Sequence, residues 1–490
     1  MVARRLRTGE RLKCRGFVER ICDHAMTSSF RVACDHFNRD FYRSGDSEIS
    51  LFSFSDIAIK EGQKYRAALD KSVEEILVSN GFTKEGMWLE GKELPPNLCS
   101  QEMEFIMIDP ATIMYDAGLP APTEISFAEG EFAQPETGLH PIKHKRRGER
   151  LLVPDEDRAS YLEDYVQYVN SFPNRDAYSM IRHLCKIEKN VDSIINVFID
   201  GVLVPEQSEH RVKEGKEEIR TDPTYIKHID IRVETEDGGR YNISDVDIDK
   251  AYRTLLAILI KTGLITRNIH FFVDGEKKLK EMIDKYFKHW KRRIFLDYMH
   301  INEKIDVLTS LGIKNIRVPC PWEEPELYKN NTKGHKKGDI KEQPMTSLSR
   351  TYGSVIKAAI FYGNCDEAID YINHIPTEHI DKKKALDDLV EYFTNRKDML
   401  TCYALRKHAG LKNSSNSSEL CNEEVICARQ KVDDRMHWRK DGSSSISALT
   451  LMFLNHEEKE WFLHSQIRFQ LYYNEPTRVR NITRKKKEVV

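Results

Sequence analysis

The spacing of hydrophobic residues changes character near the middle of the chain. In the first part, apolar residues recur at intervals of three and four over 64–78, which predicts a helix that ends near Gly81. The same spacing predicts two short helices over 160–172 and 177–187. From 194 to 204 the chain is rich in β-branched and aromatic residues, a composition typical of strands.

The segment that follows predicts a mixed sheet covered by helices. An Asp237-Gly238-Gly239 turn favours a hairpin between the second and third strands. The element order is strand-strand-strand-helix-strand-helix-strand-helix, in which three consecutive strands precede an alternation with helices. Strands are expected at 194–204, 225–234, 240–243, 268–273 and 293–296, and helices at 249–262, at 277–289 and from Asp297.

The chain from His300 to Gly410 has a mostly helical pattern, interrupted by a polar loop over 319–344. Expected helices there are 347–362, 366–375, 383–394 and 398–408, and two more follow at 419–430 and 444–454. We therefore expect an α/β protein with a separate N-terminal region, for which DNA binding is one interpretation (1–150), a helical connector (151–190), a sheet-bearing segment (191–300), two mostly helical segments (301–410 and 411–465) and a basic tail (466–490).

Composition narrows the class of protein. The 490 residues are 40% hydrophobic and 31% charged, which suits a globular chain. No apolar run approaches the roughly 18 residues that a membrane helix needs, and no apolar segment of a secretion signal follows the N-terminal arginines. Ten cysteines without a Cys-x-x-Cys pair fit a reducing compartment, so we expect a cytoplasmic protein. Cys22, His24, Cys34 and His36 could supply four zinc ligands, but their spacing matches no common finger and favours buried cysteines.

Charge is balanced overall but unevenly distributed. The chain has 76 Lys and Arg against 78 Asp and Glu, a net charge of −2, which excludes a uniformly basic nucleic-acid coat. Basic runs nevertheless occur at 3–15, 140–150 and 478–487. One such run is more often a solvated surface, whereas three favour a polyanionic partner. Within the second run, Lys145, Arg146 and Arg147 are the candidate DNA contacts.

Acidic residues end two of the expected strands. Asp200-Gly201 and Asp274-Gly275 occupy equivalent settings, and Asp297-x-x-His300 follows a third strand. Either Asp-Gly step alone is a common turn, but a carboxylate at a strand end projects into the crevice above the sheet. Glu419, on a later helix, could provide a third acid. Mg²⁺ prefers such oxygen ligands, and two ions about 4 Å apart promote phosphodiester chemistry.

Four segments together resemble a known family. FIDG (198–201), FFVDG (271–275), DYMH (297–300) and SSELCNEEVICARQKVDDRMHW (417–438) resemble the DDE transposases of bacterial insertion sequences, in the group that includes Mutator-like and hAT-like transposases. The last segment supplies a Glu-x-x-Asn, Arg-x-Lys and Met-x-Trp order through Glu419, Asn422, Arg429, Lys431, Met436 and Trp438. One departure is Arg439, where related sequences often have Ser.

The resemblance implies an RNase H-like core in two parts (191–300 and 411–465), separated by an all-α insertion (301–410), and a specific site. Asp200, Asp274 and Glu419 would be catalytic and hold two Mg²⁺ ions, with Mn²⁺ as a substitute. Roles in supporting the site or contacting DNA would belong to Asp297, His300, Asn422, Arg429, Lys431 and Trp438, with core packing the more common role of a Trp. Asp230 and Asp245 are expected to be surface residues of a strand and a turn.

The implied activity is hydrolysis at the ends of a DNA element and transfer of the freed 3′-hydroxyl into target DNA. Its setting would be a bacterial, nucleoid-associated protein that is at least a dimer on DNA. Two alternatives remain open at this point: a domesticated, non-catalytic DNA-binding protein, and an RNase H-like nuclease that only cuts.

Overall fold

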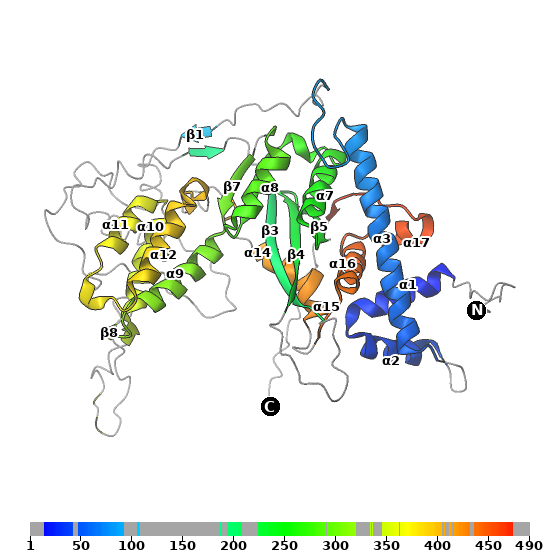
Figure 1. Cartoon of the computed structure of the whole chain (residues 1–490), viewed down its shortest axis with the longest axis horizontal. Coiled ribbons are helices and arrows are strands. Elements are labelled where there is room, and N and C mark those ends of the chain that lie inside the picture. The colour runs from blue at the N-terminus through cyan, green and yellow to red at the C-terminus, as the bar shows by residue number, and fades with distance from the viewer. Residues whose placement is uncertain are drawn as a thin grey trace, which may run out of the picture.

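A mixed six-stranded sheet lies at the centre of the computed structural model (Figure 1). Its order is β10-β5-β4-β3-β6-β7; β3, β4, β5 and β10 pair antiparallel, whereas β6 and β7 run parallel to β3. The strands are β3 (Ile194–Pro205), β4 (Tyr225–Thr235), β5 (Gly239–Asp245), β6 (Asn268–Val273), β7 (Arg292–Leu296) and β10 (Tyr472–Tyr473). The mixed α/β class and all five expected strands are confirmed, and β10 is an addition.

The structure describes most of the chain from residue 14 to residue 473. The described ranges are 14–42, 48–92, 194–207, 224–290, 292–319, 345–361, 363–403, 411–413, 416–431 and 436–473, together with residues 105–107, 186–188, 334, 336 and 406. The helix expected at 160–172, most of that expected at 177–187 and the basic residues Lys145, Arg146 and Arg147 lie outside the described residues. The expected helix is wrong at residues 186 and 187, which belong to the short strand β2 (Lys186–Glu188), paired antiparallel with β1 (Phe105–Met107).

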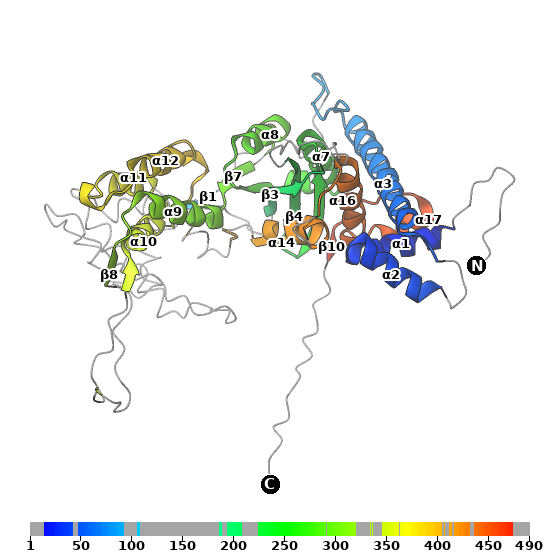
Figure 2. The same cartoon turned by 60° about the horizontal axis from the view of Figure 1, so that its bottom comes forward.

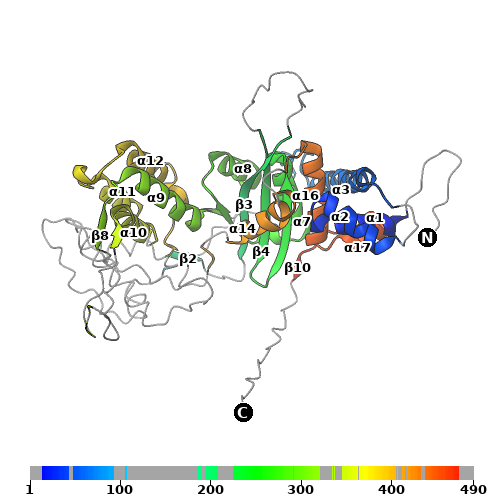
Figure 3. The ribbon, with the colours of Figure 1, turned by 90° about the horizontal axis from the view of Figure 1, so that it is seen from below.

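The two faces of the sheet have different chemistry, because side chains alternate along a strand. Ile195, Val197 and Ile199 of β3 belong to a large apolar core that includes residues of α7 (Ile248–Lys261) and α8 (Lys277–Phe287). The opposite face carries Asn196, Phe198 and Asp200, and α14 (Asn416–Asn422) packs on β3 and β4 there. Figure 2 shows α7 and α8 on one side of the sheet and α14 on the other, and Figure 3 shows α14 beside β3 and β4.

A group of helices extends beyond β7, where the helical insertion was expected (Figure 1). It contains α9 (Tyr298–Gly312), α10 (Leu348–Phe361), α11 (Cys365–Asn373) and α12 (Lys383–Thr394), with the short strands β8 (Arg317–Pro319) and β9 (Met345–Ser347). These helices share the main core with the sheet through Leu308, Leu389 and Phe393. The helix expected at 398–408 begins instead with a 3-10 turn, η4 (Lys397–Met399), and is described only in part.

The N-terminal helices do not have a core of their own, contrary to the expectation of a separate N-terminal region. They are α1 (Arg15–Thr27), α2 (Phe30–Phe41) and α3 (Leu51–Ser79). Phe54 and Tyr65 of α3 share an apolar cluster with Ile446 of α16 (Lys440–Leu454) and Trp461 of α17 (Glu458–His464). The first half of α3 is thus buried by the C-terminal helices, whereas its second half joins the main core through Leu69, Val73 and Leu77.

The helix boundaries predicted from local sequence signals agree with the structure, with one exception. The helix expected over 64–78 is the second half of α3, and Gly81 follows its end with a positive φ of 84°. The expected helix 419–430 is divided into α14, a π-helical turn at η5 (Glu423–Cys427) and α15 (Ala428–Gln430). Such π turns are frequent at functional sites.

In the described part of the chain, no helix is both long enough and apolar enough to cross a membrane.

Gly62 provides a test of how α3 is attached. A Cβ at this position would lie 2.2 Å from the carbonyl oxygen of Ser445 in α16, a backbone atom that cannot move aside. We expect Gly62→Ala to lower the free energy of unfolding by about 1–3 kcal/mol, the usual cost of overpacking, as measured by urea denaturation. Gly16→Ala in α1 is the matched control, because nothing lies within 4 Å of its added Cβ. Equal stability of the two variants would contradict the close packing of α3 on α16.

Candidate functional site

Three aspartates form a row across adjacent strands on the polar face of the sheet. Asp200 of β3 is directly paired with Asp230 of β4. On its other side, β3 pairs with β6 in a register that includes Phe198 opposite Phe272. Continuing that register by two residues brings Asp274, just past the end of β6, beside Asp200. Paired positions on neighbouring strands direct their side chains to the same face, so the sheet aligns Asp230, Asp200 and Asp274.

Asp200 is held by two hydrogen bonds. Its Oδ1 accepts one from the backbone N–H of Gly201 at 2.7 Å, and its Oδ2 accepts one from Nδ2 of Asn422 at 2.6 Å. Asn422 is the last residue of α14, so the helix that carries the expected third acid reaches the first one. Asn422 and Glu419 are three positions apart and therefore lie on the same side of the helix.

Asp274 is fixed by a tight turn. Its Oδ1 accepts a hydrogen bond from the backbone N–H of Glu276 at 2.8 Å. Gly275 between them has a φ of 90°, and a Cβ there would lie 2.6 Å from Nε of Arg396, which itself donates to the Gly275 carbonyl at 2.9 Å. Burial raises the pKa of Asp274, and the charge of Asp200 raises it further. Asp200 and Asp274 therefore interact electrostatically, as two acids sharing one site would.

The Asp297-x-x-His300 motif lies next to this pair. Asp297 is the N-cap of α9, as expected of an Asp before a helix: its Oδ1 accepts from the backbone N–H of Met299 at 2.9 Å. His300 Nε2 is 3.7 Å from Asp297 Oδ2. Burial lowers the pKa of His300, but the charges of Asp297, Asp200 and Asp274 outweigh burial and raise the pKa above its usual value. The motif thus places a readily protonated imidazole within the field of both acids.

Asp230 and Asp245 are not the surface residues that the sequence suggested. Asp230 is 1% exposed and Asp245 4% exposed. The pairing of β4 between β3 and β5 buries both, and Asp245 forms an ion pair with Arg66 of α3 at 3.0 Å. Burial, with a contribution from the Asp200 charge, raises the pKa of Asp230 to about 8. The sequence signal for the burial of Asp230 was the presence of a charged residue in the middle of a predicted strand.

Glu419 is exposed, and no ion pair or hydrogen bond of its side chain is recorded within the described part of the chain. Glu424, the nearby acid on the π-helical turn, forms an ion pair with Arg232, whose side chain is fully buried. Among the described residues, no three His, Cys, Asp or Glu side chains already form a cluster of metal-binding geometry. The sheet therefore brings Asp200, Asp274, Asp297 and His300 together, and the position of α14 leaves Glu419 one turn from Asn422.

The Arg-x-Lys and Trp residues divide into one exposed and two buried groups. Arg429 is buried, in contrast to the expected phosphate contact: its Nε donates to the Ala25 carbonyl at 2.6 Å, and its guanidinium lies 4.6 Å from the ring of Phe30 and 5.1 Å from that of Trp438. Trp438 is a core residue whose Nε1 donates to the Gln430 carbonyl at 3.2 Å. Lys431 is exposed, and its charge lowers the pKa of Asp230.

Cys22, His24, Cys34 and His36 form no metal-binding group in the described part of the chain. Cys22 and Cys34 are buried in the apolar cluster around α3, which confirms the preferred interpretation of buried cysteines.

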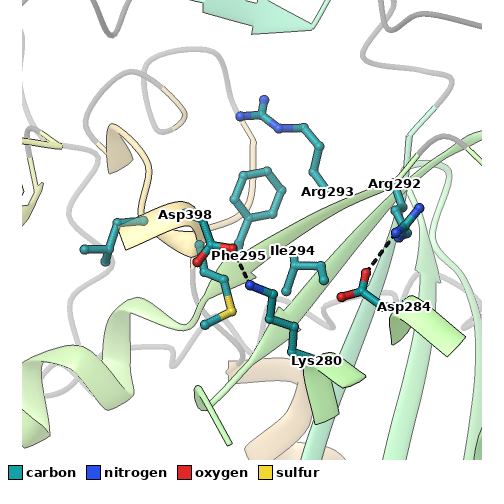
Figure 4. Close-up of a pocket in the computed structure, with 9 residues that line it drawn as sticks. Lys280, Asp284, Arg292, Arg293, Ile294, Phe295 and Asp398 are labelled. Carbon is teal, nitrogen blue, oxygen red and sulfur yellow. Dashed lines mark hydrogen bonds and ion pairs between the residues drawn. The ribbon is translucent and has the colours of Figure 1, made fainter. Parts of the chain in front are cut away.

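A separate hollow beside β7 contains several charged residues (Figure 4). There Lys280 pairs with Asp398, and Nη2 of Arg292 lies 2.8 Å from Oδ1 of Asp284. These ion pairs balance charge within the hollow, so it offers less to an anion than its residue types suggest.

Comparisons with known proteins add little to this description. No family model matches the sequence, and no curated protein sequence matches it. Among solved structures, the chain has a weak similarity to the Drosophila P element transposase strand transfer complex, with 13% identity, coverage of 57% of this chain and 68% of that chain, and a TM-score of 0.18. A TM-score this low carries no argument about fold or function.

The raised pKa of His300 can be tested directly. Because carboxylates stabilise the protonated ring, His300 should titrate above 6.5, and Asp200→Asn or Asp274→Asn should lower its pKa. The measurement is a pH titration of ¹³C-labelled histidine by NMR, with the His300 signal assigned by its loss in His300→Gln. Asp306→Asn is the control, because Asp306 lies on the same helix but pairs with Lys357 at 2.6 Å. An unchanged pKa of His300 in both test variants would show that His300 does not interact electrostatically with Asp200 and Asp274.

Proposed function

We propose that this protein is a DDE-type transposase with an RNase H-like core, which hydrolyses a phosphodiester at an element end and joins the freed 3′-hydroxyl to target DNA. The observation that supports this most strongly is the register that aligns Asp200 with Asp274 on two parallel neighbouring strands. Numbered by their order along the chain, the first five strands of the sheet lie side by side in the order third, second, first, fourth, fifth. This is the order expected for an RNase H-like fold.

Asp200, Asp274 and Glu419 are the residues that would hold two Mg²⁺ ions, or Mn²⁺ in their place. Carboxylate oxygens are the ligands that these hard cations prefer, and repulsion between Asp200 and Asp274 without metal would be relieved by a cation. When bound, a pair of ions would supply activation of the attacking oxygen and stabilisation of the leaving one. Glu419 would supply the third carboxylate from α14, whose Asn422 contacts Asp200.

The groups around the acids suit a phosphate substrate. His300 is held by Asp297 and favours the protonated form, so it would present positive charge to a phosphate next to the acid row. Lys431 would do the same from the side of α15. Gly201 and Asn422 orient the Asp200 carboxylate through its two oxygens. Water and the DNA 3′-hydroxyl would act as nucleophiles, so no covalent protein–DNA intermediate is required.

The partner would be duplex DNA, bound by a homo-oligomer of at least two copies. A chain with a net charge of −2 needs its bases gathered locally to bind a polyanion, and Lys145, Arg146 and Arg147 are the candidate group. Imperfect inverted repeats in the DNA flanking the reading frame would support a mobile element and provide the natural substrate. A bacterial source and a nucleoid location remain part of the proposal.

The catalytic assignment predicts loss of cleavage without loss of DNA binding. Asp200→Asn, Asp274→Asn and Glu419→Gln should each reduce cleavage of a duplex carrying the flanking repeat by more than about 100-fold, since even outer-shell partners of metal ligands are worth 10–100-fold. Asp306→Asn should cleave at the wild-type rate. The assay measures nicking and strand transfer in Mg²⁺, and binding by fluorescence anisotropy.

Each outcome of this assay separates the candidates. Wild-type cleavage by any one acid variant removes that residue from the site. Cleavage without strand transfer would indicate a nuclease, and binding without either step would indicate a non-catalytic DNA-binding protein.

The DNA-binding assignment predicts a change in salt dependence. Because each phosphate contact contributes a slope of about −0.9 in log affinity against log salt, replacing Lys145, Arg146 and Arg147 with Gln should flatten the slope by about two to three units. Affinity should fall alike for all sequences, since phosphate contacts carry no base information. Fluorescence anisotropy at several salt concentrations measures this. An unchanged slope would move the DNA surface to another basic run.

A further inference from the structure

Asp230 is the least accounted-for charged residue of the sheet. It is 1% exposed, lies directly opposite Asp200 in the β3–β4 pairing, and faces the same side. Neither of its carboxylate oxygens has a hydrogen-bond partner of regular geometry among the described residues, although the hydroxyl of its cross-strand neighbour Ser244 is close enough to lower its pKa. Burying a carboxylate without a partner is costly. Among the described residues, no side chain supplies such a partner for a charged Asp230.

Other buried acids of the same strands are compensated within the protein. Glu234 lies on β4, on the same face as Asp230, and pairs with Lys412 and with Arg240 at 3.3 Å. Asp245 of β5 pairs with Arg66. The two cations that influence Asp230 do not form an ion pair with it: Arg232 is paired with Glu424, and Lys431 is exposed. Asp230 thus differs from its neighbours in having an acid, Asp200, as its paired residue.

We propose that Asp230 is a further ligand of the divalent cation held by Asp200, an inference that rests on the proposed metal-dependent function. Directly paired residues on antiparallel strands have Cβ atoms about 4.5–5.5 Å apart. Two carboxylates at that separation can both reach one Mg²⁺ ion, whose oxygen ligands lie at about 2.0–2.1 Å. The cation would then be bound between β3 and β4 as well as between β3 and β6.

This arrangement explains two features together. It gives the unpartnered oxygens of Asp230 a ligand, and it makes the first cation independent of Glu419, which the structure leaves exposed. Glu419 would be required for the second cation. The carboxylate itself is needed for this role, because an Asn of the same shape would fill the same space with only one oxygen.

The test is Mn²⁺ binding to the full chain, measured by isothermal titration calorimetry without DNA. Asp230→Asn should weaken the tighter Mn²⁺ site at least about tenfold, as Asp200→Asn should. Glu234→Gln is the matched control, since it removes a buried charge from the same face of β4 and should leave Mn²⁺ affinity unchanged. Thermal unfolding is the second readout: Asp230→Asn should melt higher than the wild type without metal and gain less from Mg²⁺.

The outcomes distinguish this inference from the proposed function. Wild-type Mn²⁺ affinity in Asp230→Asn, with loss in Asp200→Asn, overturns the role of Asp230 and leaves the proposed metal site standing. No Mn²⁺ binding by the wild-type chain overturns both. A lower melting temperature of Asp230→Asn without metal, combined with unchanged Mn²⁺ affinity, assigns Asp230 a structural role and likewise overturns the inference.

Discussion

The hydrogen bonding of β3 on both of its edges is the constraint on which the site depends. β3 is antiparallel to β4 on one side and parallel to β6 on the other. Since the side-chain period of a strand is two, a slip of one residue in either pairing would turn Asp230 or Asp274 to the opposite face, away from Asp200. The apolar core opposes such a slip, because Ile195, Val197 and Ile199 must remain against α7 and α8.

Charge on the polar face is balanced by segments that are distant in sequence. His300 comes from the start of the helical insertion, and Asn422 and Lys431 come from helices beyond it. Arg232, buried next to Asp230 along β4, is neutralised by Glu424 of the same C-terminal segment. Placement of the segment that contains Glu419 is therefore coupled to the electrostatics of the sheet.

The N-terminal helices hold that segment in place from behind. Arg429, immediately after the π-helical turn, donates to the Ala25 carbonyl of α1 and stacks with Phe30 of α2. α3 in turn packs on α16, so closely that Gly62 meets the backbone of Ser445. Helices α1, α2 and α3 thus contribute to the position of α14 and α15. This connection explains why a basic residue of the motif is buried.

The sequence alone determined the secondary structure of the sheet and the nature of its acids. The strand at 268–273 and the helix at 383–394 are observed with the expected bounds, because apolar spacing, Gly and capping residues act within a few neighbouring positions. Only tertiary structure decided three features: the burial of Asp230 and Arg429, the contact of Asn422 with Asp200, and the packing of α3 against the C-terminal helices. Each depends on strand register or on helices hundreds of residues apart, and local spacing carries no information about either.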